Sequence, residues 1–446
     1  MKFLKLKKFL FGSIAVLVGA ALLTACSNGS SSNNGKTTIT FWAATNPTQL
    51  KFWQQMAKDY EAKNPNVTVK VTEMKNSPTS EASIQAAIAS GTQPTLSENI
   101  SRSFAAQLAA SKAIVPLNNQ TEFNGIVTKR GMTNTMSNWK FAGGKEYVLP
   151  LYVNPMLFVW NITALKSLGI DKAPTTYSEW YAAAQKLQST NSKLSLWGSA
   201  GSSGPSALVD PTGYQRWFDF FPLYDAASNG APFVQGTSYK ADTKSLTNVY
   251  SFVNKLASLK GFNTEAQTNS FETGQVLTEV LGPWTFPNWQ TQFPNLVYGK
   301  NYTLTAPPVP DGQSTSSVKT YADSKGVVIY SKATDAQKKA AMSFIEFVYG
   351  DSKNDLTLLN MTGLPPAKDN LATDSAFKSY FEKNPQMKAY ANAINDAIPA
   401  MDNANYNNIQ QAFGTNAWIP SVKGTMLAND AVKATEKAVK SNLTSN

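Results

Sequence analysis

The chain has 446 residues, of which 42% are apolar and 15% charged, so it can build large cores and is too weakly charged to be disordered. It contains no histidine, which excludes Ser-His and Cys-His nucleophile pairs and removes the commonest zinc ligand. The formal charge is +11, but the lysines are scattered along the chain. This pattern is typical of a lysine-rich solvated surface and argues against nucleic-acid binding.

Residues 1–25 have the features of a secretory leader. Four lysines among the first eight residues precede an apolar run at 9–23, which is short for a membrane-spanning helix. The run ends at Leu23-Thr-Ala-Cys26, which resembles the lipobox of bacterial lipoproteins and implies that Cys26 is the lipid-modified mature N-terminus. Cys26 is the only cysteine, so an intrachain disulfide is excluded. Residues 26–36 would then be the lipidated cysteine and a flexible Gly/Ser/Asn-rich tether.

Strand and helix patterns alternate along the rest of the chain. In chain order we predict a strand at 37–42, helix 50–63, strand 67–72, helices 80–90 and 102–111, strands 114–117, 148–151 and 156–160, helices 178–187 and 246–259, strand 326–330, and helices 335–349 and 430–443. This alternation predicts βαβ units and a parallel sheet. Residues 196–236 are rich in Gly, Ser, Pro and aromatic residues, and they show only weak periodicity.

Five segments, in this order, resemble the extracellular solute-binding proteins of ABC importers, in the branch similar to maltose-binding protein. They are Ile39 to Val71 with Tyr60-Glu-Ala-Lys-Asn-Pro65, Ile88 to Pro94, Val148 to Trp180, Phe271 to Trp284 with Gly282-Pro-Trp284, and Pro307 to Pro365. Thr95 stands where the family usually has an aspartate. The order and spacing of the segments cover nearly the whole mature chain.

The resemblance implies an α/β, two-lobed periplasmic-binding-protein fold of type II, with three interlobe crossings and a ligand cleft between the lobes. We expect the crossings near Pro150, Pro307–Pro310 and Leu364–Lys368. The N-lobe would comprise residues 37–149 and 311–364, and the C-lobe residues 150–310 and 365–446. Closure around the solute would be a hinge motion.

A sugar presents apolar C–H faces and a rim of hydroxyls, so its site needs aromatic platforms and planar polar groups. The candidate ligand-binding residues are Trp42, Glu98, Asn99, Arg102, Asn154, Tyr214, Arg216, Trp217, Trp284 and Tyr406. The resemblance places Trp42, Asn154, Trp284 and Tyr406 at family cleft positions. For each candidate the alternative is a packing role, which we assign outright to Trp53, Trp180 and Trp289.

The predicted function is that of an extracytoplasmic lipoprotein that delivers a sugar or oligosaccharide to an ABC permease. It would be monomeric, need no cofactor or metal, and be lipid-anchored at the outer face of the bacterial membrane, with a Gram-positive cell favoured. An anionic polyol such as a glycerol phosphate is the alternative ligand. A surface adhesin and a glycoside hydrolase are further alternatives; Glu98, Asp210, Asp219 and Asp323 are available carboxylates for the hydrolase, although no motif selects a pair.

Overall fold

The computed structural model describes residues 35–141, 143–190, 193–199, 206–265 and 268–443, apart from the side chains of Gly213 and Tyr214. Contacts divide the chain into Met1–Lys36 and Thr37–Asn446, and every element below belongs to the second unit. The first strand, β1 (Thr37–Ala43), shows how the sequence alternation is used. Ile39, Phe41 and Ala43 are buried, and the residues between them are more exposed, as the period-2 pattern predicts.

The first sheet confirms the predicted βαβ pattern and adds two antiparallel pairings. Its strand order is β12 (Ala397–Ile398), β11 (Thr320–Ile329), β3 (Leu96–Ser101), β1 and β2 (Val67–Glu73), with β4 (Leu149–Pro155) also on β11. β1 is parallel to β2 and β3, and α1 (Pro47–Lys63) and α2 (Ser80–Ser90) make the connections. β11 runs antiparallel to both β3 and β4.

A second sheet has the order β10 (Tyr302–Thr305), β5 (Leu157–Asn161), β9 (Val276–Leu281) and β6 (Ser195–Trp197). β5 is antiparallel to both of its neighbours, and β6 is parallel to β9. A separate hairpin joins β7 (Val234–Gln235) to β8 (Ser238–Tyr239).

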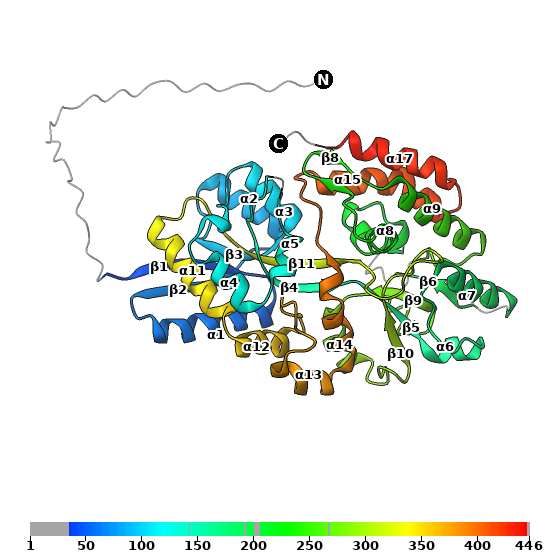
Figure 1. The fold of residues 1–446 in the computed structure, drawn as a ribbon, viewed down its shortest axis with the longest axis horizontal. Helices are drawn as coiled ribbons and strands as arrows, with labels where there is room; N and C mark the ends of the chain where they lie inside the picture. Colours follow the sequence, from blue (N-terminus) through cyan, green and yellow to red (C-terminus); the bar gives the residue numbers. More distant parts are fainter. Residues whose placement is uncertain (1–34, 142, 191–192, 200–205, 266–267, 444–446) are drawn as a thin grey trace, which may run out of the picture. The chain divides into compact units, whose positions relative to one another are not determined.

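The helices surround these sheets (Figure 1). Those not yet named are α3 (Arg102–Ala110), α4 (Phe123–Arg130), α5 (Thr133–Ser137), α6 (Ile162–Ser167), α7 (Tyr177–Ser189), α8 (Phe220–Ser228), α9 (Thr243–Ser258), α10 (Phe286–Gln292), α11 (Asp335–Tyr349), α12 (Ser352–Thr362), α13 (Lys378–Lys383), α14 (Pro385–Asn392), α15 (Tyr406–Phe413), α16 (Ile419–Val422) and α17 (Ala428–Lys440). The predicted strand at 114–117 is wrong: Ile114 makes one isolated bridge, to Tyr330, and a 3-10 turn follows at Leu117–Asn119.

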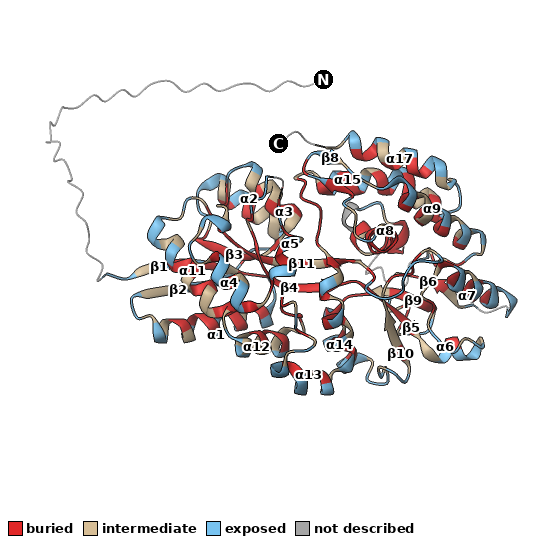
Figure 2. Ribbon diagram, viewed as in Figure 1, coloured by how far each residue is buried: buried red, intermediate tan, exposed pale blue. Residues whose placement is uncertain are grey.

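Two large apolar clusters hold the fold together. The first joins the first sheet to α1, α3 and α11, and the second packs α7, α8, α9, α15 and α17 around the aromatic residues of the second sheet. Most helices bury one side and expose the other, whereas β4 is buried along its whole length (Figure 2). Trp53, Trp180 and Trp289 are buried, which confirms their packing assignment. In the part of the chain that the structure describes, no helix has the length and apolar character to span a membrane.

Three passages between the sheets can be followed through the described residues. The chain leaves the first sheet after β4, at Met156, returns between β10 and β11, and leaves again after β12. The first passage lies six residues after Pro150, because β4 continues past this proline. Near the third expected crossing, Pro365 and Ala367 are instead hydrogen-bonded to Val153 and Leu151 of β4, at 3.0 Å each. Residues 365–398 therefore include contacts to the first sheet, whereas the sequence prediction assigns them to the C-lobe.

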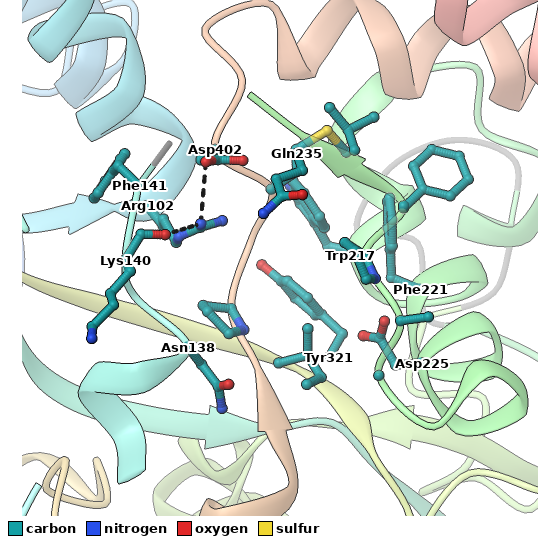
Figure 3. Close-up of a pocket in the computed structure, with 18 of the residues that line it drawn as sticks. Arg102, Asn138, Lys140, Phe141, Trp217, Phe221, Asp225, Gln235, Tyr321 and Asp402 are labelled. Atoms are coloured by element: carbon teal, nitrogen blue, oxygen red, sulfur yellow. Dashed lines mark hydrogen bonds and ion pairs between the residues drawn. The ribbon is translucent and has the colours of Figure 1, made fainter. Parts of the chain in front are cut away.

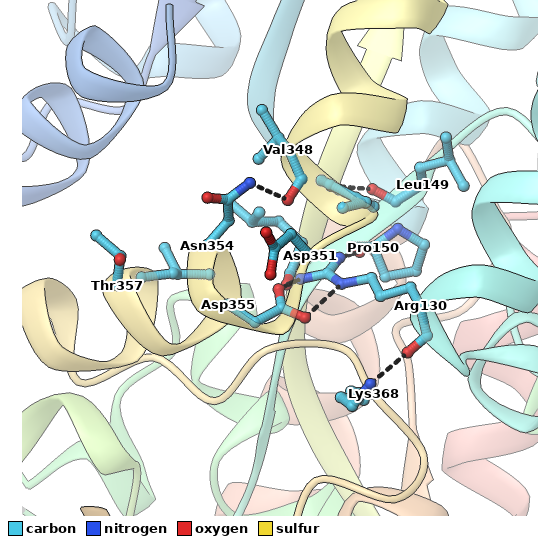
Figure 4. Close-up of polar contacts among 12 residues, drawn as sticks. Arg130, Leu149, Pro150, Val348, Asp351, Asn354, Asp355, Thr357 and Lys368 are labelled. Carbon is cyan, nitrogen blue, oxygen red and sulfur yellow. Dashed lines mark hydrogen bonds and ion pairs between the residues drawn. The ribbon is translucent and has the colours of Figure 1, made fainter. Parts of the chain in front are cut away.

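Arg130 holds the start of β4 in place (Figure 4). Its guanidinium donates to the carbonyls of Pro150 and Leu151, at 2.9 Å each, and pairs with Asp355 at 2.7 Å. Lys368 Nζ donates to the Arg130 carbonyl at 3.0 Å. Because the arginine is fully buried and every contact is hydrogen-bonded, it ties α4, β4, α12 and the 365–368 segment together.

Candidate functional site

A cavity of about 570 Å³ opens where the two sheets meet. Its lining comes from the β1–α1 turn, β3, β4, β11, the turn before α10 and the end of α12. The lining residues are Ala44, Thr45, Asn46, Pro47, Thr48, Gln49, Asn76, Ser80, Asn99, Tyr152, Asn154, Trp284, Pro287, Asp323, Lys325, Met361, Thr362 and Leu364. The volume lies within the range of small-molecule sites.

Strand register builds the polar floor of this cavity. In the antiparallel pair of β4 and β11, Asn154 is opposite Asp323, and Tyr152 is opposite Lys325. Side chains at alternate positions share a face, so these two pairs form one polar patch, and all four residues line the cavity. Asn154 is buried and its Oδ1 has no hydrogen-bond partner within the described residues. A buried amide oxygen of this kind is available to a hydroxyl donor from a ligand.

Trp284 supplies an aromatic surface at the wall of the same cavity. It lies in the 3-10 turn Pro283–Thr285 and is 41% exposed, unusual for so large an apolar side chain. The indole folds back over Gly282, where an added Cβ would come within 2.2 Å of the ring, so only glycine permits this position. Phe218 meets the indole edge-on, with a centroid separation of 6.1 Å.

Glu98 lies beneath the cavity and holds its lining in place. It is fully buried and accepts hydrogen bonds from Ala44 N at 2.8 Å and from Gln49 Nε2 at 3.0 Å. Burial raises its pKa from 4.5 to about 7, although both hydrogen bonds oppose the rise. The pairing of β3 with β11 is irregular here, and Asn99 adopts a φ of 65° and lines the cavity.

Two further candidates, Arg102 and Trp217, line a second, smaller cavity rather than this one. Three others make contacts within the fold. Trp42 packs half-buried against the first apolar cluster, Arg216 pairs with Asp219 at 2.8 Å, and Tyr406 donates to Glu81 of α2 at 2.7 Å. None of these three lies among the residues that line the larger cavity, as far as the described chain shows. The Tyr214 side chain and Cys26 lie outside the described residues.

Sequence reasoning missed Tyr152 and Lys325, and it considered Asp323 only as one of several carboxylates. Both faces of β11 are largely buried, so its sequence gives no clear alternation that would mark these residues as partners of a cavity. Pairing β11 with a strand about 170 positions earlier required the fold. The polar turn Thr45-Asn46 after β1 was the signal that could have been used, because strand ends face ligands in α/β folds.

Comparison with known proteins gives the family. A profile described as bacterial extracellular solute-binding protein matches residues 55–389. The chain belongs to this family. A solved structure of the uncharacterized protein lmo0859 from Listeria monocytogenes EGD-e is similar, with 50% identity, a TM-score of 0.88, and coverage of 92% of this chain and 100% of that one.

More distant solute-binding proteins share the fold. The cyclic alpha-maltosyl-1,6-maltose binding protein from Arthrobacter globiformis has 21% identity and a TM-score of 0.76, over 92% of this chain and 99% of that one. The ABC substrate-binding protein Lmo0181 from Listeria monocytogenes, in complex with cycloalternan, has 16% identity and a TM-score of 0.66, over 91% and 98%. The fold of this solute-binding protein is therefore the two-lobed α/β fold that the sequence predicts.

Proposed function

We propose that this solute-binding protein binds a neutral carbohydrate, in the size range of an oligosaccharide, in the larger cavity and delivers it to the permease of an ABC importer. The observation that carries the proposal is the exposed Trp284 in the same cavity as the polar floor of Tyr152, Asn154, Asp323 and Lys325. An aromatic face suits the C–H face of a sugar ring, and the floor suits its hydroxyl rim. One protein of the same fold is named for binding cyclic alpha-maltosyl-1,6-maltose, and another was solved in complex with cycloalternan.

The charge of the cavity favours a neutral solute over a glycerol phosphate. Asp323 and Lys325 are the charged residues among its described lining, so their charges cancel. The N-terminus of α1 also faces the cavity, but the Asn46 side chain already accepts from the backbone N–H groups of Thr48 and Gln49. At the start of α1, an anion would find neither excess positive charge nor free backbone donors at Thr48 and Gln49.

Calorimetric titration tests the ligand class. Cyclic alpha-maltosyl-1,6-maltose, cycloalternan and linear maltodextrins would be compared with sn-glycerol 3-phosphate. We expect saturable binding of a neutral oligosaccharide and none of the phosphate, with the sugar recovered chemically unchanged. Binding at 100 times Kd should stabilise the protein by about 2.7 kcal/mol, measured as a higher Tm. Selective binding of the phosphate would overturn the proposal, and cleavage of the sugar would support the hydrolase alternative.

We further propose that lipid-modified Cys26 anchors the protein to the outer face of the cell membrane and that the protein acts as a monomer. The leader, the lipobox resemblance and the tether support this placement. Cys26→Ser should abolish membrane retention in the producing bacterium, with solute binding unchanged. A serine variant that stays acylated and membrane-bound would rule out lipidation at this residue.

A further inference from the structure

A second cavity, of about 330 Å³, has a cluster of aromatic residues in its lining (Figure 3). Trp217 stacks on Tyr321 of β11, with a centroid separation of 4.8 Å and an angle of 13°, and lies 4.6 Å from Phe221 of α8. All three belong to the lining, together with Phe233 beside β7. Such a wall gives the cavity an aromatic side built from rings that pack on one another.

The charges at one end of this cavity are already paired. Arg102 forms an ion pair with Asp402 at 3.3 Å and donates to the carbonyls of Ala400 and Lys140. Asp402 also accepts from Gly236 N at 2.9 Å. Lys140 contributes its carbonyl, while its side chain points away from the aromatic wall (Figure 3). This end therefore has no need of a further ion.

The other end holds Asp225, an acid with no such partner. Asp225 lies in α8, is 4% exposed, and lines the cavity below Trp217 and Phe221 (Figure 3). Within the described residues its side chain has neither an ion pair nor a hydrogen bond, and its Oδ2 is sealed from solvent. Burial raises the pKa of this carboxyl well above its ordinary value. Without a counter-ion the buried acid is therefore held in its neutral form, and a cation beside it would favour the charged form.

We propose that the second cavity is a separate binding site for a small organic cation, whose ammonium group pairs with Asp225 beside the stacked rings of Trp217 and Tyr321. A cation satisfies the carboxylate and is attracted by aromatic faces, which a neutral or anionic ligand cannot do together. The cavity volume suits a molecule with a handful of heavy atoms. This site does not depend on the carbohydrate proposed for the larger cavity.

Calorimetry on the full chain tests the site, with choline as the probe and 3,3-dimethylbutan-1-ol as its neutral isostere, at constant ionic strength. We expect saturable choline binding in the millimolar range, corresponding to about −4 kcal/mol, and no binding of the alcohol. Asp225→Asn should weaken choline binding at least about 10-fold. Asp171→Asn, which removes an exposed aspartate of the same charge, should leave it unchanged.

Two results would overturn the proposal. One is equal choline affinity in the parent protein and Asp225→Asn; the other is no binding of choline, methylammonium or butylammonium, which would leave Asp225 merely hydrated. Thermal unfolding provides an independent measurement, because removal of an uncompensated acid should raise the Tm by about 2 °C or more in the absence of ligand. A lower Tm for both Asp225→Asn and Asp225→Ser would show that the carboxylate has a structural role, which also contradicts the proposal.

Discussion

The two cavities use their tryptophans in opposite ways. Trp284 in the larger cavity is 41% exposed and touches the aromatic edge of Phe218, whereas Trp217 in the smaller cavity is 7% exposed and stacks on Tyr321. A residue with little buried surface contributes little to the folded state, so its apolar face remains free for a ligand. The difference teaches that exposure, rather than residue type, decides whether an indole face is free for a sugar ring or is already used in packing.

The largest expected effect concerns Trp217. Trp217→Ala removes a buried indole from between Tyr321 and Phe221, so it should lower the free energy of unfolding by about 3–5 kcal/mol. Urea denaturation measures this loss. Carbohydrate affinity of the folded fraction should change little, and a stable variant with lost carbohydrate binding would reverse the comparison between the two cavities.

A buried acid is associated with each cavity, and the two acids differ in their partners. Glu98, beneath the larger cavity, accepts hydrogen bonds, whereas Asp225, in the lining of the smaller cavity, has no hydrogen-bond partner among the described residues. The folded pKa of Glu98, about 7, exceeds its ordinary value of 4.5, so the folded state binds this proton more tightly. The contribution of Glu98 to the free energy of unfolding is therefore greatest below pH 4.5, falls as the pH rises to 7, and stays constant above pH 7. The total decrease is about 3 kcal/mol.

Comparing the parent protein with Glu98→Gln isolates this contribution from those of other buried acids. The difference between their unfolding free energies should change by about 3 kcal/mol between pH 4.5 and 7, as urea denaturation at each pH would show. A constant difference across this range would mean that Glu98 titrates as an ordinary carboxyl.

Trp284→Ala should have the opposite effect to Trp217→Ala, with a loss of carbohydrate affinity and little change in stability. Stacking a sugar face on the indole removes on the order of 100 Å² of apolar surface from water, which contributes about 2–3 kcal/mol. Carbohydrate affinity should fall about 30–150-fold by calorimetry, while the free energy of unfolding changes by less than about 1 kcal/mol. Normal binding with lost stability would place Trp284 with the packing tryptophans.

The smallest expected effect concerns the polar floor. Asp323→Asn keeps the shape of the side chain but removes a charged acceptor, so it should weaken binding of a neutral sugar by about 1–2 kcal/mol, or roughly 10-fold. Asp335→Asn, at the exposed start of α11, is the matched control and should bind normally. Unchanged carbohydrate affinity in Asp323→Asn would show that β11 does not bind the ligand through this carboxylate.

Local signals in the sequence predicted much of the fold. α2 and α11 begin and end where predicted, because Thr79 and the Thr334–Gln337 capping box start them and Gly91 ends α2. α8 was missed because it is buried on all sides and therefore lacks the periodicity of an amphipathic helix.

The site was harder to predict, because it depends on partners far apart in the chain. Three of the candidate residues, Asn99, Asn154 and Trp284, line one cavity. Arg216, a candidate ligand residue, instead donates two hydrogen bonds to Asp219, three residues away. The guanidinium of Arg130 is likewise used within the fold, because it donates to Asp355 and to two backbone carbonyls. Which partner an arginine meets is settled by packing, which a single sequence does not contain.

The Arg130 contacts have a mechanical consequence for the connecting strands. Since the carbonyls of Pro150 and Leu151 are held by a buried guanidinium, the stiff part of β4 extends to Leu151. Backbone torsions that change in a lobe movement would then lie after Leu151, on the stretch toward Met156 that carries Tyr152 and Asn154. A solute bound at these side chains would restrict the very torsions that permit movement. Binding and closure would be coupled within one short stretch of chain, with no relay through the rest of the fold.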